Sequence, residues 1–115
     1  MSIVMDKSYA FAIRCVKLFR YLCNEHKEYV LSKQLLRSGT AIGALLREAK
    51  FAQSKADFIN KNSIALKEAN ETDYWFDLLY DTGYINQKMY DDIKKDIQEI
   101  ISLLVSIVKS SKINN

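Results

Sequence analysis

Residues 32–49 read SKQLLRSGTAIGALLREA. Apolar or small side chains recur every three or four residues, at Leu35, Gly39, Ile42, Leu46 and Ala49. This spacing brings side chains to one face of an α-helix. Glycine inside a helix costs about 1 kcal/mol, so we interpret Gly39 and Gly43 as sites of close helix approach, with a kink as the alternative. Ser32 is predicted to cap the N-terminus of this helix.

Three further segments carry the same periodicity, and residues typical of helix ends separate them. Ser54 opens a variant of the capping box, Gly83 has the position of a left-handed C-terminal residue, and Asn86 is predicted to cap the last helix. The chain has no Pro and only three Gly, too few turn residues for a sandwich or barrel. We therefore predict one all-α domain, residues 1–115, folded as an antiparallel up-down-up-down four-helix bundle. The predicted helices span about 5–25, 32–53, 55–82 and 87–110, followed by a frayed tail at 111–115.

The first and last predicted helices have more apolar surface than a monomeric bundle covers. Apolar residues fill about half of the circumference of the first helix. They surround the last two turns of the fourth helix almost completely. A surface helix needs an apolar stripe of only about 100°, and exposed apolar patches usually mark interfaces. We therefore expect the protein to self-associate.

Charge is divided unevenly along the chain. Residues 1–56 hold ten Lys or Arg and four Asp or Glu, whereas residues 57–115 hold seven and ten, so the two parts carry +6 and −3. Attraction between helices of opposite sign inside the bundle is the simpler interpretation. A basic surface that binds nucleic acid is the alternative.

Several classes of site and location are excluded by what the sequence lacks. No uncharged apolar run of about 18 residues occurs, so we expect no membrane span. Cys15 and Cys23 are too far apart on one helix for a disulfide, and free thiols without a signal peptide favour the cytoplasm. The glycines have neither P-loop nor dinucleotide spacing, and one histidine is too few for a di-iron bundle. We expect no cofactor and no metal site.

The candidate nucleic-acid-binding residues lie on the polar side of the first helix. Arg14, Lys17 and Tyr21 are spaced at i, i+3 and i+7, and Lys27 follows the helix. Such cations can contact phosphates while the tyrosine ring stacks on a base. The simpler interpretation is a solvated face with an amphipathic tyrosine.

Two carboxylates, Glu68 and Glu71, lie among apolar residues on one side of the third helix. An acid–base pair is one interpretation. We favour ion pairs with Arg37 or Arg47 of the second helix, because carboxylates set among apolar residues need a partner.

One arrangement of residues suggests an enzyme. Arg20 and His26 have the R-x5-H spacing of HEPN-type ribonucleases, in which the arginine would stabilise phosphate charge and the histidine would move protons. The simpler interpretation is a solvated helix end with a cation near the C-terminal dipole. We assign no catalytic residue.

The order of several motifs resembles the signature of the bacterial four-helix-bundle family named after proteins encoded in 23S rRNA intervening sequences. The matching stretches are Gln34 to Ala44, Arg47-Glu48-Ala49, Ala52-Gln53-Ser54, Asp57-Phe58-Ile59, Lys67 to Trp75, Leu78-Leu79 and Gly83-Tyr84-Ile85. The resemblance implies an antiparallel four-helix bundle that assembles into a ring-like homopentamer. The family is also similar to the accessory protein of diversity-generating retroelements, a basic pentamer that binds nucleic acid and a reverse transcriptase.

The sequence therefore favours a non-enzymatic oligomeric module that binds RNA or another nucleic acid through basic surfaces. The alternative is a structural or protein-interaction scaffold without nucleic-acid binding, and the remote alternative is the ribonuclease.

Overall fold

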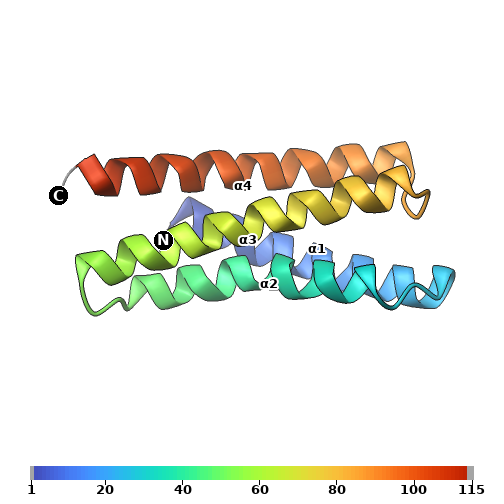
Figure 1. Ribbon diagram of the computed structural model, residues 1–115, viewed down its shortest axis with the longest axis horizontal. Helices are drawn as coiled ribbons and strands as arrows, with labels where there is room; N and C mark the ends of the chain where they lie inside the picture. The colour runs from blue at the N-terminus through green and yellow to red at the C-terminus, as the bar shows by residue number, and fades with distance from the viewer. Residues whose placement is uncertain (1, 114–115) are drawn as a thin grey trace.

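The helical periodicity of the sequence extends over nearly the whole chain. The computed structural model describes residues 2–113, which form the helices α1 (Ile3–His26), α2 (Leu31–Lys50), α3 (Lys55–Asp81) and α4 (Gln87–Ile113). Each helix runs antiparallel to the preceding one (Figure 1). The bundle measures 47 × 22 × 21 Å, and the described residues contain no strand. The prediction of an all-α, up-down-up-down bundle is confirmed.

The helix ends differ slightly from the predicted ones. α2 ends at Lys50 rather than near residue 53, and α4 continues to Ile113 rather than stopping near residue 110. Residues 114–115 of the predicted tail lie outside the described residues. Gly83 has a φ of 85°, as its predicted C-terminal position requires. Lys27 ends α1 in the same left-handed region, with a φ of 52°.

The N-terminus of α2 is capped by a residue that the sequence analysis missed, so the prediction of Ser32 as N-cap is wrong. The carboxylate of Glu28 accepts hydrogen bonds from the backbone N–H groups of Val30 (3.2 Å), Leu31 (3.0 Å) and Ser32 (2.7 Å). The Ser32 hydroxyl instead donates to the Glu28 carbonyl at 2.7 Å. Burial alone would raise the pKa of Glu28, but the three N–H groups hold it below its ordinary value.

The core takes one apolar face from every helix. Phe11 of α1 meets Phe76 of α3 edge to face, with ring centroids 5.8 Å apart, an arrangement that aromatic rings favour. The most fully buried aliphatic side chains are Leu22, Leu35, Ile42, Leu79, Ile97, Ile100 and Leu104. These residues fall at the helical spacing read from the sequence, so the buried faces follow from the pattern.

Close helix approach explains Gly39. A Cβ atom at this position would overlap the buried Sγ of Cys15 on α1. At Gly43 a Cβ atom would stand 3.5 Å from the Ser8 hydroxyl, an ordinary contact. The structure therefore requires glycine at the first position and leaves room for alanine at the second.

The exposed apolar side chains lie at other places than the sequence predicts. The side chains Ile101, Leu103 and Ile107 of α4 are partly buried against the core, so the last turns of α4 are not a large unpartnered surface. The exposed large apolar side chains near the start of α1 and the end of α2 are Ile3 (66 %), Tyr9 (61 %), Ile13 (44 %) and Phe51 (76 %). No helix among residues 2–113 is both long and apolar enough to cross a membrane.

Candidate functional site

Ion pairs join the basic and acidic parts of the chain across helix boundaries. Between α1 and α4, Lys7 Nζ lies 2.6 Å from Glu99 Oε1, and Arg14 pairs with Asp96. Between α2 and α3, Lys61 Nζ lies 3.0 Å from Glu48 Oε1. Attraction between α1 and α4 therefore uses some of the cations of α1 but not all of them, whereas the pair between α2 and α3 takes its cation from α3.

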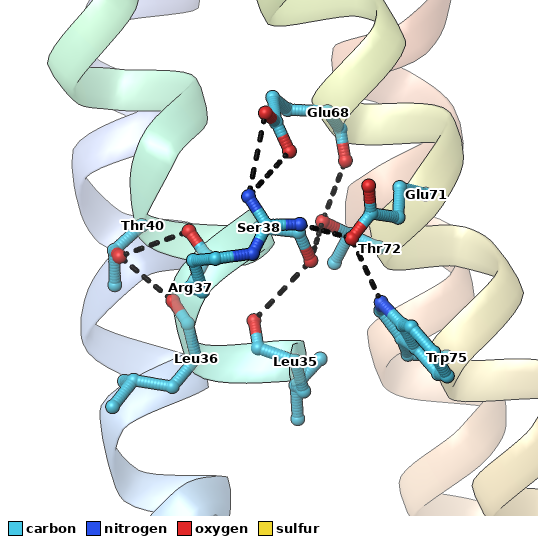
Figure 2. Close-up of polar contacts among 9 residues, drawn as sticks. All are labelled: Leu35, Leu36, Arg37, Ser38, Thr40, Glu68, Glu71, Thr72 and Trp75. Atoms are coloured by element: carbon cyan, nitrogen blue, oxygen red, sulfur yellow. Dashed lines mark hydrogen bonds and ion pairs between the residues drawn. The ribbon is translucent and has the colours of Figure 1, made fainter. Parts of the chain in front are cut away.

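The most elaborate polar cluster lies between α2 and α3, and we call it the α2–α3 seam. It contains Arg37, Ser38, Glu68, Glu71, Thr72 and Trp75 (Figure 2). Arg37 Nη1 lies 3.3 Å from Glu68 Oε1, and Arg37 Nη2 pairs with Glu71 Oε2. The indole N–H of Trp75 donates to Glu71 Oε2 at 3.1 Å.

Partial exposure limits the strength of these ion pairs. The Arg37 side chain is 52 % exposed, whereas the Glu68 side chain is 15 % exposed. The hydrogen bond from Trp75, followed by that from Arg37, lowers the pKa of Glu71. Both carboxylates face one guanidinium, so the cluster is an ion-pair network on the rim of the bundle.

Beneath the ion pairs, two hydroxyl groups meet in the interior. The Thr72 hydroxyl lies 2.8 Å from the Ser38 hydroxyl and 2.8 Å from the Glu68 carbonyl oxygen. One hydroxyl hydrogen serves one acceptor at a time, so Thr72 donates either to Ser38 or to the Glu68 carbonyl. The Ser38 hydroxyl in turn can donate to the Leu35 carbonyl at 3.5 Å. Ser38 and Thr72 are fully buried, which makes the hydrogen bond between them the buried polar link between α2 and α3.

Of the two arginines expected to pair with Glu68 and Glu71, only Arg37 does so within residues 2–113. Arg47 is exposed and lines a groove of about 460 Å³ between α1 and α2, together with Met5, Tyr9 and Gly43. The two arginines therefore occupy different surfaces of the bundle.

A second groove, which we call the α1–α4 groove, has a volume of about 300 Å³. Its lining residues are Arg14, Lys17, Leu18, Tyr21, Met89, Asp92 and Ile93. The structure thus brings together three of the four residues considered for nucleic-acid binding, Arg14, Lys17 and Tyr21. Lys27 does not line this groove, and its Nζ donates to the Asn24 carbonyl oxygen at 3.1 Å.

The α1–α4 groove carries charges of both signs, unlike a purely basic patch. Arg14 is engaged by Asp96, whereas Lys17 has no ion pair among the described residues. Asp92 on the opposite wall is exposed and also has no ion pair in the described chain. The α4 wall, which includes Asp92 and Met89, does not follow from the sequence pattern, because the packing of two helices distant in sequence creates the groove.

Aromatic rings gather where α1 ends. The His26 Nε2 atom lies 3.1 Å from the Tyr21 hydroxyl oxygen, and the His26 ring meets the Tyr84 ring edge to face at 5.7 Å. The His26 ring thus contacts Tyr21 and Tyr84 and does not hydrogen-bond to Arg20 within the described residues.

A cation is also enclosed between α3 and α4. Lys94 Nζ lies 2.5 Å from Asp73 Oδ1 and 3.0 Å from Asp77 Oδ1, and the Tyr90 hydroxyl donates to Asp77 at 2.7 Å. Burial alone would lower the pKa of Lys94, but the two carboxylates raise it. The cluster holds the two helices together and carries one net negative charge, because two carboxylates share one ammonium group.

No other polar chemistry stands out in the part of the chain that is described. Residues 2–113 contain no group of three or more His, Cys, Asp or Glu side chains placed to hold a metal ion. Cys15 and Cys23 are free, and burial raises the pKa of the Cys15 thiol to about 12, which makes it a poor nucleophile.

Comparison with known proteins gives one family and a close structural relative. Residues 1–106 match the family model described as 23S rRNA-intervening sequence protein. The fold is similar to the crystal structure of a protein of unknown function from the S23 ribosomal protein family of Bacteroides thetaiotaomicron VPI-5482. The two chains are 60 % identical, the match covers 93 % of this chain and 99 % of the other, and the TM-score is 0.92. A comparison with curated proteins gave no match.

Proposed function

The chain belongs to the 23S rRNA-intervening sequence protein family, and we propose that it is a non-enzymatic, self-associating module that binds RNA or another nucleic acid. One observation carries this proposal: many cations of α1, α2 and the turn between them have no ion pair within residues 2–113. These exposed side chains are Lys17, Arg20, Lys27, Lys33, Arg47 and Lys50. Cations that carboxylates have not neutralised are free to replace the counterions of a phosphate backbone.

The end of α1 offers both kinds of contact that single-stranded nucleic acids use. Lys17 and Lys27 provide positive charge, and Tyr21 provides a ring that is 36 % exposed. Cations follow the phosphates while aromatic faces stack on bases, without requiring a particular sequence. The presence of cations and an exposed ring at the end of α1 supports binding by this end of the bundle.

Self-association is the second part of the proposal. Tyr9, Ile13 and Phe51 expose apolar area near the start of α1 and the end of α2, and exposed patches of this kind are typical of interfaces. The parts of the chain carrying +6 and −3 would also attract one another between copies. A contact between unlike faces closes into a ring when its rotation permits.

The ring size that we propose, a pentamer, comes from the family resemblance. Such a pentamer would carry 5 × 3 = +15 from the net charge of +3 per chain, and repeated weak sites would gain avidity. The two cysteines that form no disulfide support a cytoplasmic location.

The test is a mobility-shift titration with total RNA at about 50 mM and 200 mM salt, where phosphate contacts lose affinity steeply. We expect Lys17→Glu with Lys27→Glu to weaken binding strongly. Arg14 is left intact, because its reversal would also break the pair with Asp96. Lys109→Glu with Lys112→Glu is the matched control: it changes the net charge equally, near the end of α4, at the other end of the bundle (Figure 1). Equal loss in both double variants would contradict a site at the end of α1.

A protein-interaction scaffold is the second candidate function. The exposed side chains Tyr9, Ile13 and Phe51 favour it, as does the neutralisation of Arg14 by Asp96. A stable oligomer that binds no RNA at about 50 mM salt, the condition that favours phosphate contacts, would select the scaffold.

A further inference from the structure

An unpaired carboxylate stands in a groove that otherwise looks suited to a polyanion. Asp92 lines the α1–α4 groove with Arg14 and Lys17, yet it has no ion pair among residues 2–113. The adjacent carboxylate on α4 differs, since Asp91 accepts a hydrogen bond from Gln87 at 2.9 Å. A carboxylate near bound phosphates repels them and weakens binding, unless the carboxylate contacts another part of the nucleic acid.

The rest of the groove provides the surroundings that a flat heterocycle needs. Leu18, Met89 and Ile93 contribute apolar lining, and Tyr21 contributes an aromatic ring. The volume of about 300 Å³ is at the lower end of the range for small-molecule sites. This volume suits one nucleobase rather than a base pair.

We propose that the α1–α4 groove binds one unpaired guanine of a single-stranded nucleic acid. The two Asp92 carboxylate oxygens accept hydrogen bonds from guanine N1–H and N2–H, Tyr21 contacts the ring, and Lys17 contacts the adjoining phosphate. This inference rests on the proposed nucleic-acid binding and adds the base that the site selects.

Hydrogen-bond complementarity decides in favour of guanine. An ionised carboxylate presents acceptors only, and guanine is the base that offers two adjacent donors on its Watson–Crick edge. Adenine and cytosine each place an acceptor beside their amino group, and uracil flanks one N–H with two carbonyl oxygens. Each of these three bases would set an acceptor against the Asp92 carboxylate. Unpaired bases are commonly read on this edge.

The experiment measures fluorescence anisotropy with labelled decamers of uridine that carry one central G, A, C or U. For the wild-type protein we expect the G decamer to bind at least about fivefold tighter than the other three, the lower end of what a bidentate base contact provides. Asp92→Asn presents one donor and one acceptor, a pair that each of the four bases can match on this edge, so this variant should lose the preference for G. The matched control is Asp91→Asn, which removes the same charge one residue away and should keep the preference.

The outcomes separate this inference from the proposed function. Equal binding of all four decamers by the wild-type protein would overturn the guanine site and leave general nucleic-acid binding in place. Loss of the G preference in Asp91→Asn as well would also overturn it, because the effect would then follow charge rather than position. If no decamer binds even at about 50 mM salt, the guanine site and the proposed function both fail.

Discussion

The α2–α3 seam and the α1–α4 groove lie on different sides of the same bundle and differ in how their polar groups are used. In the seam, Arg37 and Trp75 engage the carboxylates, and buried hydroxyls join the helices beneath them. In the groove, Lys17 and Asp92 have no ion pair among the described residues, and α1 contacts α4 less extensively than other neighbouring helices contact each other. Polar groups that satisfy one another stabilise a fold, whereas unsatisfied exposed ones remain available to a ligand.

The largest effect on stability should come from the close approach of α2 to α1. Gly39→Val places a branched side chain against the buried Cys15 and should lower the free energy of unfolding by about 2–3 kcal/mol through overpacking. Urea unfolding followed by Trp75 fluorescence measures this loss in the free energy of unfolding. Gly43→Ala is the control; it should be neutral or stabilising by up to about 1 kcal/mol. Equal losses in both variants would show that the two glycines are not distinguished by packing.

The buried hydroxyl pair should give the next largest effect. Thr72→Val keeps the shape but removes the group that bonds to Ser38, so it should cost about 1–2 kcal/mol. Thr40→Val removes a hydroxyl that bonds only within α2 and should cost less than about 0.5 kcal/mol. Thermal unfolding of the two variants compares them directly. A more stable Thr72→Val protein would contradict the structural role of this hydrogen bond.

A smaller, pH-dependent effect is expected from the ion pairs of the seam. Because the pKa of Glu71 is lowered from 4.5 in the folded protein, its contribution is present above about pH 4.5 and is lost as the pH falls through the folded value. Glu71→Gln should cost about 0.5–1 kcal/mol at pH 7, since Arg37 is half exposed. The difference between variant and wild type should shrink on acidification. A difference that stays constant from pH 7 to pH 3 would refute this assignment.

The smallest effect is expected on the groove side. The side chains of Arg14 and Asp96 are 42 % and 38 % exposed, and pairs of this kind contribute little. Arg14→Ala should change the free energy of unfolding by at most about 0.5 kcal/mol, measured by urea titration, and Lys7→Ala should behave alike. A loss above about 2 kcal/mol would mean that the α1–α4 side is a structural seam too.

The sequence predicts the fold well because helical periodicity is a local property of the chain, and the buried positions Leu35, Ile42 and Leu79 follow from it. Prediction from the sequence fails where a contact depends on how each helix is oriented about its own axis. Arg37 and Arg47 are ten residues apart on one helix, and only the packed orientation shows that Arg37 faces Glu68.

The candidate site was only partly predictable for the same reason. Arg14, Lys17 and Tyr21 share one helix face, so their grouping could be inferred, but Asp92 joins them only through the packing of α4. The sequence does not indicate the cap formed by Glu28, because the Glu28 side chain reaches over the turn that follows α1 to the start of α2. Ser32, by contrast, is of a residue type that usually caps a helix.

We infer that stability depends on the seam, whereas nucleic-acid binding depends on the cations at the end of α1. The most direct test is the slope of log Kd against log salt for a labelled single-stranded RNA, measured for the wild-type protein, Thr72→Val, and Lys17→Glu with Lys27→Glu. We expect a steep slope for the wild-type protein and the same slope for Thr72→Val. The charge-reversed protein should bind weakly with a flatter slope, because fewer counterions are released. Equal slopes and affinities for all three proteins, with the charge-reversed one still folded, would contradict this inference.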